Sequence, residues 1–201
     1  MRIHLLDLNA GEANRGTPAL LDLFARHGCE VSCYEVRLAG ELPMDDTGIW
    51  VLGGGPGSPL DGGHWREPLL QRLRHRLGRQ RPTLGICFGF EILALALGAR
   101  VRSLARGRGD IFPLTLADGA GTWSHLTGAS VYEKRDFGVF EVPHAGAEVL
   151  AFGPEGDVAA LRIGTSVLGV IFHPEADLGP PTRLVFESVL PAFLMQHREG
   201  T

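Results

Sequence analysis

A cysteine between two glycines is the residue of this chain best suited to act as a nucleophile. Cys87 lies in the segment GICFG at residues 85–89, where one apolar run gives way to a second with helical character. The G-x-C-x-G spacing resembles the elbow that lifts a nucleophile out of a sheet, because glycines permit a strained turn and close helix–strand packing. The start of a helix also favours the thiolate. We therefore predict that Cys87 is a nucleophile rather than a small core residue.

A histidine and a carboxylate two residues apart could supply the base that such a thiol needs. His173-Pro174-Glu175 follows an apolar run that ends at Phe172. An extended backbone around the proline would let Glu175 turn back toward the imidazole and fix its tautomer, as the third member of a catalytic triad must. Active sites of open α/β sheets lie at the carboxyl ends of strands, which suits this position. We predict a Cys87-His173-Glu175 triad.

A glycine-rich loop is the third candidate. The segment GGGPGSP at residues 53–59 follows the apolar run at 49–52. Backbone N–H groups of such a loop can face a small substrate, which is what an oxyanion hole requires. The loop lacks the lysine of the P-loop pattern, so a P-loop is excluded. Taken alone, the loop is also compatible with an ordinary turn.

The elements that must position these residues alternate in the first half of the chain. Apolar runs typical of strands occur at 3–8, 30–37, 49–52 and 83–86, and helical segments occur at 17–27, 67–77 and 88–97. This alternation is typical of a parallel sheet with helices on both faces.

After residue 100 the pattern changes to short β-like runs separated by glycines and prolines. They lie at 101–104, 111–116, 130–132, 139–142, 149–152, 158–163 and 167–172. We expect them to extend the first sheet as partly antiparallel strands, with a last helix at about 181–197. No repeat or linker interrupts the chain, so residues 1–201 are expected to form a single domain.

Composition excludes several classes of function. The net charge of −4 provides no basic field for nucleic acid or an anionic membrane surface. No apolar run approaches the roughly 18 to 20 residues of a membrane span. Three cysteines are too few, and odd in number, for a disulfide framework, and no signal peptide is apparent, so we expect a cytoplasmic protein. The histidines and cysteines lack metal-ligand spacing, and we expect no metal and no cofactor.

Taken in order, the glycine loop, the cysteine elbow and His-Pro-Glu resemble the class I, triad-type glutamine amidotransferase family. The resemblance covers nearly the whole chain. It implies a flavodoxin-like three-layer α/β sandwich with a mostly parallel central sheet, extended by short antiparallel strands. It also implies that Cys87 attacks the side-chain amide of glutamine, forming a γ-glutamyl thioester and releasing ammonia to a separate synthetase partner. His173 would be the general base and acid, and Glu175 would orient it.

The same resemblance implies the residues around the substrate. The backbone N–H of Phe88 and one from the turn of Gly55 and Gly57 would hold the oxyanion, and these two glycines would line the glutamine pocket. The family generally has a substrate-binding glutamine four residues after the nucleophile, where this chain has Glu91. An ionised carboxylate only accepts hydrogen bonds. It would repel the α-carboxylate of glutamine or select another amide or ester, unless Glu91 does not touch the substrate.

A second departure lies where many members of the family carry a His-x-Asp motif on the substrate side. This chain has Lys134-Arg135-Asp136-Phe137 there. Two alternatives to glutamine hydrolysis therefore stay open. The same triad would hydrolyse a γ-glutamyl peptide or another small amide, or the chain would be a non-catalytic regulatory domain.

Overall fold

The carboxyl ends of five parallel strands meet at one edge of the main sheet. The structure is a computed structural model that describes residues 1–12 and 16–198. Within these residues the main sheet has the strand order β2-β1-β3-β4-β10-β9-β8-β6. Its parallel part consists of β2 (Glu30–Glu35), β1 (Arg2–Asp7), β3 (Ile49–Leu52), β4 (Thr83–Ile86) and β10 (Val167–Val170). Antiparallel strands complete it, namely β9 (Val158–Ile163), β8 (Ala147–Phe152) and β6 (Thr115–Leu116).

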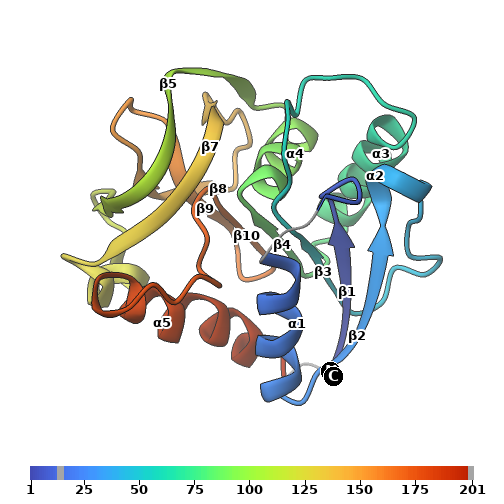
Figure 1. Cartoon of the computed structure of the whole chain (residues 1–201), viewed down its shortest axis with the longest axis horizontal. Coiled ribbons are helices and arrows are strands. Elements are labelled where there is room, and N and C mark those ends of the chain that lie inside the picture. The colour runs from blue at the N-terminus through green and yellow to red at the C-terminus, as the bar shows by residue number, and fades with distance from the viewer. Residues whose placement is uncertain (13–15, 199–201) are drawn as a thin grey trace.

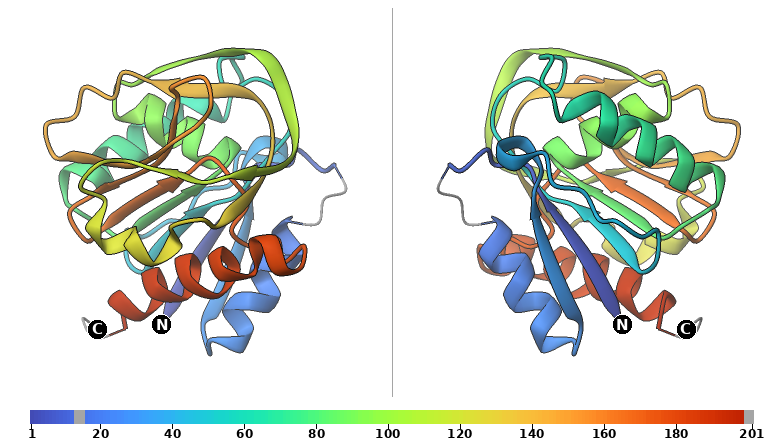
Figure 2. Two further views of the ribbon diagram at one scale, coloured as in Figure 1. Left: turned by 90° about the vertical axis from the view of Figure 1, so that its left-hand side faces the viewer. Right: turned by 90° about the vertical axis from the view of Figure 1, so that its right-hand side faces the viewer.

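Helices cover both faces of this sheet. They are α1 (Gly16–Arg26), α2 (Val36–Ala39), α3 (Arg66–Gly78), α4 (Phe88–Ala96) and α5 (Pro180–Gln196), with a 3-10 helix, η1 (Gly121–Leu126). Figures 1 and 2 show α1 and α5 on one face and α3 and α4 on the other. The buried side chains fall into two clusters. Phe24 of α1 and Leu190 of α5 belong to one and Leu69 of α3 to the other, while α4 contributes to both, with Phe90 in the first and Ile92 in the second. The predicted three-layer α/β architecture is confirmed.

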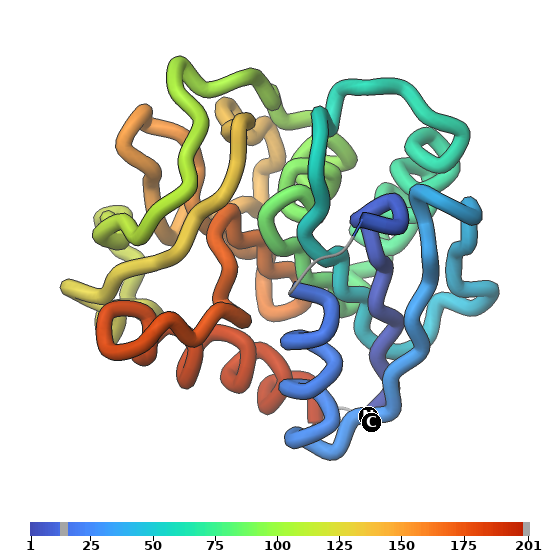
Figure 3. The backbone as a smooth tube through the Cα atoms, in the orientation of Figure 1, coloured from blue at the N-terminus to red at the C-terminus, as the bar shows by residue number. Residues whose placement is uncertain are grey.

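One part of the predicted topology is wrong. The runs at 101–104, 111–116, 130–132 and 139–142 were expected to extend the main sheet. Thr115–Leu116 do so as β6, but the other residues of these runs do not. Instead, β5 (Arg100–Pro113) and β7 (Ser130–Phe140) pair with each other as a separate antiparallel ribbon, and Figure 3 shows them side by side. The polar middle of β5, at residues 105–110, reads as a loop, yet its backbone pairs with β7 beyond a register shift between Ser103 and Arg108. Exposed polar strands lack the apolar alternation that marks a half-buried one.

A smaller difference affects the site. The strand expected at 30–37 ends at Glu35, where the short helix α2 begins. Gly40 ends α2 in a left-handed conformation and donates its N–H to the Val36 carbonyl. The turn places Arg37 just beyond the carboxyl end of β2. Among the described residues, no helix is both long and apolar enough to cross a membrane.

Candidate active site

Cys87 occupies a strained turn between β4 and α4. Its φ and ψ angles are 52° and −116°, a region that non-glycine residues rarely adopt. The flanking glycines allow this turn to pack tightly. A Cβ on Gly85 would lie 2.8 Å from the Cα of Phe90, and one on Gly89 would collide with the Leu52 carbonyl oxygen of β3. The elbow predicted from sequence is therefore present in the backbone.

Hydrogen bonds fix the Cys87 backbone between two elements. Its N–H donates to the Val170 carbonyl of β10 at 2.8 Å, and its own carbonyl accepts the N–H of Glu91 at 3.1 Å as α4 begins. The thiol is 4% exposed, and its Sγ lies 3.5 Å from the carbonyl oxygen of Lys134 in β7. The ribbon thus covers Cys87, and the thiol donates a weak hydrogen bond to the Lys134 carbonyl.

His173 and Glu175 lie in the segment that follows β10, the strand next to β4. The Nδ1 atom of His173 and the Oε1 atom of Glu175 are 2.8 Å apart. Both side chains are largely buried, with 17% of His173 and 3% of Glu175 exposed. The His173 N–H donates to the Tyr132 carbonyl of β7 at 2.9 Å, and the Tyr132 and His173 rings are in contact. The imidazole is therefore held from its backbone and from its Nδ1 atom.

Gly54 lies against both His173 and Cys87. A Cβ added there would lie 3.1 Å from the Cε1 of His173 and 3.8 Å from the Cβ of Cys87, so the glycine packs against both side chains.

Burial alone would lower the pKa of His173. The adjacent Cys87 and Glu175 outweigh it and raise the pKa well above the usual 6.5. The arrangement favours a protonated imidazole beside the sulfur.

Three backbone donors in the segments next to this pair have no hydrogen-bond partner among the described residues. Within the described residues, no hydrogen bond engages the N–H of Phe88, Gly55 or Gly57. Phe88 is the first residue of α4, where helical N–H groups have no partner in the helix. Gly55 packs so closely on the Leu8 carbonyl that any side chain would collide with it. Gly57, with a φ of 88°, faces Arg37 rather than the imidazole.

Glu91 is buried one turn along α4 from Cys87. Its side chain is 3% exposed, and no described residue hydrogen-bonds its carboxyl group. Burial raises the pKa of Glu91 from 4.5 to about 8, while nearby Arg135 lowers it and Asp136 raises it. The carboxyl therefore keeps its proton at neutral pH, and a protonated carboxyl has an O–H donor as well as an acceptor. Glu91 faces the same ribbon segment that covers Cys87.

Sequence reasoning missed a buried ionic cluster in that ribbon. Arg135 lies 3.0 Å from Glu133 and 2.6 Å from Asp157 of the segment before β9, and Arg108 joins at 3.2 Å from Glu133. Burial would lower the pKa of Arg135, but the Glu133 and Asp157 carboxylates raise it above its usual value. The cluster anchors the residue next to Lys134, whose carbonyl touches the thiol. Charged residues at alternating ribbon positions were the only sequence sign of it.

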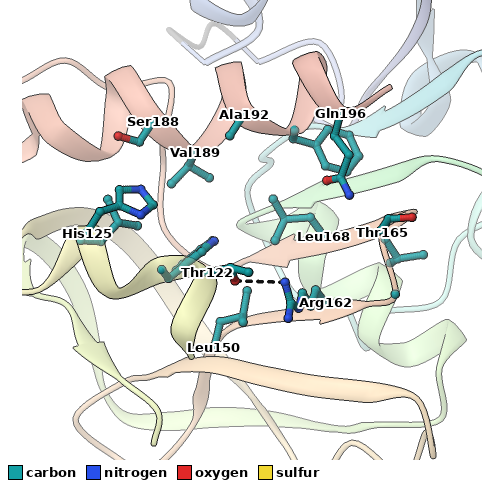
Figure 4. Close-up of a pocket in the computed structure, with 15 residues that line it drawn as sticks. Thr122, His125, Leu150, Arg162, Thr165, Leu168, Ser188, Val189, Ala192 and Gln196 are labelled. Atoms are coloured by element: carbon teal, nitrogen blue, oxygen red, sulfur yellow. Dashed lines mark hydrogen bonds between the residues drawn. The ribbon is translucent and has the colours of Figure 1, made fainter. Parts of the chain in front are cut away.

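A separate cavity of about 210 Å³ lies between α5, η1 and the strands β8 to β10. Figure 4 shows its mixed polar and apolar lining, in which Arg162 donates to the Thr122 hydroxyl at 3.0 Å. Arg162 is also paired with Glu148 at 2.7 Å. None of the predicted triad residues lines this cavity. Within the described residues, no group of three or more His, Cys, Asp or Glu side chains is arranged to hold a metal ion.

Known proteins share this arrangement of elements. Two solved structures superpose on the chain, a glutamine amidotransferase from Thermotoga maritima and one from Methylobacillus flagellatus. The first has a TM-score of 0.74 at 18% identity and covers 97% of this chain and 84% of its own. The second has a TM-score of 0.73 at 20% identity and covers 94% and 76%. At these identities the likeness establishes the fold.

Sequence comparison gives the family. The carbamoyl phosphate synthase small chain of Rhizobium meliloti (strain 1021) is 31% identical over 169 residues, which are 80% of this chain and 39% of the relative. A GMP synthase [glutamine-hydrolyzing] from Pyrobaculum aerophilum is 33% identical over 177 residues, 84% of this chain and 33% of the relative. The chain thus spans two fifths or less of these relatives. The family model for glutamine amidotransferase class-I matches residues 16–192, and the chain belongs to this family.

Proposed function

We propose that this chain hydrolyses the side-chain amide of glutamine to glutamate and ammonia, with Cys87, His173 and Glu175 as a catalytic triad. The carrying observation is the 2.8 Å contact between the His173 Nδ1 and the Glu175 carboxylate, beside a cysteine on a strained elbow. That contact leaves Nε2 as the nitrogen that exchanges a proton with the thiol and with the leaving group. Family membership supports the same chemistry.

The reaction proceeds in two halves. The Cys87 sulfur attacks the amide carbon of glutamine after its proton has passed to His173. The tetrahedral oxyanion collapses, the carbon–nitrogen bond breaks, and His173 returns the proton to the leaving ammonia. Water, deprotonated by His173, then cleaves the γ-glutamyl thioester and regenerates the thiol. The raised pKa of His173 supports the thiolate–imidazolium pair that begins this cycle.

Backbone donors hold the oxyanion. The N–H of Phe88 is free at the start of α4, and the N–H groups of Gly55 and Gly57 are free in the loop after β3 among the described residues. Preorganised donors of this kind are commonly worth about 10²- to 10³-fold in kcat each. Gly55 is the better placed of the two glycines, because it adjoins Gly54, which packs against His173 and Cys87.

A γ-glutamyl peptide or another small amide is the second candidate substrate, and Glu91 is the observation that favours it. The buried carboxyl has no partner among the described residues, so a substrate group is free to pair with it. In its protonated form Glu91 also offers the O–H donor that a glutamine side chain would supply as N–H. The Glu91→Gln variant separates the two substrates. A large gain in glutaminase activity favours the peptide or other amide, and an unchanged rate favours glutamine.

Release of ammonia supports a synthetase partner. The relatives are named as synthase chains, and this chain matches only 39% of the first. We propose that residues 1–201 act as one glutaminase domain in the cytoplasm and pass ammonia to a separate synthetase. A non-catalytic regulatory role does not require a strained cysteine beside a paired histidine and carboxylate.

Glutamate release from glutamine tests the proposed function. Purified chain is assayed beside Cys87→Ala and His173→Ala, with circular dichroism to establish that each variant is folded. We expect both substitutions to abolish release. Hydrolysis that persists in folded Cys87→Ala would refute the mechanism.

A further inference from the structure

Arg37 connects two segments that come from different strands. Its Nη1 donates to the Leu8 carbonyl at 3.0 Å and also to the Pro56 carbonyl of the glycine loop. Leu8 follows β1 and Pro56 lies in the loop after β3, so one guanidinium nitrogen joins two neighbouring strand ends. Gly55 packs against the same Leu8 carbonyl. Arg37 and the Leu8 carbonyl therefore both contact the glycine turn, Arg37 at Pro56 and Leu8 at Gly55.

The same guanidinium lies over two aromatic rings. Its central carbon is 5.0 Å from the Phe88 ring and 5.6 Å from the Trp65 ring, and these two rings contact each other. A guanidinium over an aromatic face is attracted by the ring electrons, more strongly where water is excluded. Phe88 is almost fully buried and begins α4 directly after Cys87. Arg37 thus also contacts the residue whose N–H is free beside the nucleophile.

The contact between Arg37 and the Pro56 carbonyl also fixes the orientation of the peptide that follows Pro56. In a trans peptide the carbonyl and the following N–H point in opposite directions. Fixing the Pro56 carbonyl toward Arg37 therefore fixes the direction of the Gly57 N–H and limits rotation of the whole turn from Gly55 onward. The proline contributes no N–H of its own.

We infer that Arg37 is the positioning residue of the oxyanion site, because one guanidinium joins the Gly55–Gly57 turn to Phe88. This inference rests on the proposed function and adds a residue to it. The backbone N–H groups of the oxyanion site stabilise negative charge that develops only in the transition state. Loosening them therefore lowers kcat and leaves KM nearly unchanged.

Arg37→Met and Arg37→Lys test this role. Methionine keeps an unbranched apolar stem and removes every hydrogen bond, while lysine keeps the charge and loses the planar fork. The matched control is Arg72→Met. Arg72 also lies over an aromatic ring, that of Trp50 at 5.4 Å, and donates to the Pro43 carbonyl at 2.9 Å, but it lies away from Cys87.

Three rates are measured for each variant: hydrolysis of glutamine, hydrolysis of a γ-glutamyl p-nitrophenyl ester, and alkylation of Cys87 by iodoacetamide. Alkylation forms no oxyanion, so it reports on the thiol and on folding alone. We expect Arg37→Met to lower kcat for both substrates by about 10- to 100-fold. In this variant the alkylation rate and KM should stay within about twofold of wild type. The kcat of Arg37→Lys should lie between those of Arg37→Met and wild type. Arg72→Met should match the wild type in all three rates.

An Arg37→Met variant with unchanged kcat, or one whose alkylation rate falls as much as its kcat, would overturn the positioning role. Failure of the proposed glutaminase function would give a different set of results. In that case the wild-type chain hydrolyses the ester through Cys87 and leaves glutamine intact, and the ester still tests Arg37. If Cys87 hydrolyses neither substrate, both proposals fail.

Discussion

The Glu175 carboxylate lies 2.8 Å from the Nδ1 of His173, and only 3% of the Glu175 side chain is exposed. Its second oxygen is buried and has no hydrogen-bond partner among the described residues. The carboxylate is therefore directed almost entirely at the imidazole. Such a contact sets the tautomer of the histidine and stabilises its protonated form.

Glu175→Gln should lower kcat by about 10²- to 10⁴-fold, because an amide nitrogen facing Nδ1 would favour the wrong tautomer. The Glu175 charge also raises the pKa of His173. Its removal should move the alkaline limb of the pH–rate profile, where the imidazolium is lost, to lower pH. Steady-state kinetics across pH 5.5 to 9.5 measure both effects. Glu187→Gln on the exposed side of α5 is the control, and equal profiles for the two variants would contradict the role of Glu175.

Glu91 should make the protein less stable as pH rises toward about 8. Its pKa is about 8 in the folded chain, against 4.5 as the ordinary value. Between these values the folded state keeps a proton that the unfolded state has released, so stability falls with rising pH. Glu91→Gln removes this dependence. Its melting temperature relative to wild type should increase from pH 5 to pH 9, while exposed Glu30→Gln shows no trend. Parallel curves for Glu91→Gln and wild type would contradict a buried neutral carboxyl.

Sequence alone was sufficient for the features that local patterns encode. The strand at 83–86 and the strand at 158–163 have the predicted bounds, and Cys87 stands in a strained elbow. The approach of His173 to Cys87 follows from topology, because both follow neighbouring parallel strands.

Long-range polar contacts could not be predicted in the same way. The sequence pattern predicts a strand at Arg37, and nothing near it in the sequence indicates Leu8 or Pro56 as partners. The pairing of Arg135 with Asp157 also joins distant segments, through a ribbon whose exposed strand lacks apolar alternation. Such contacts depend on how whole helices and strands pack against one another. The spacing of apolar residues along the sequence does not encode this packing.

Asp157→Asn should destabilise the chain by about 3 to 5 kcal/mol, because it leaves the buried Arg135 guanidinium poorly compensated. The Asp157 side chain is 0% exposed and lies 2.6 Å from Arg135. Urea unfolding measures the change. Arg100→Met breaks an exposed pair with Glu141, and exposed pairs are worth about 1 kcal/mol or less. Similar losses of unfolding free energy in the two variants would show that the buried cluster stabilises the chain no more than an exposed ion pair does.

Gly55→Ala should lower kcat by about 10²-fold or more, because the new methyl group would collide with the Leu8 carbonyl and displace the loop donors. Gly62→Ala is the control, since a Cβ there meets nothing within 4 Å. Melting temperatures show whether the loop change also unfolds the chain. A folded Gly55→Ala variant with wild-type kcat would exclude this turn from the oxyanion site.

Covalent labelling with a chloro-ketone analogue of glutamine tests the central claim most directly, since it detects the nucleophile and the substrate pocket together. The protein is incubated with the analogue, with and without excess glutamine, and the modified peptide is identified by mass spectrometry. We expect one adduct, on Cys87, that glutamine suppresses and that His173→Ala slows. Labelling of Cys29 or Cys33 in place of Cys87, or Cys87 labelling that glutamine does not suppress, would contradict it.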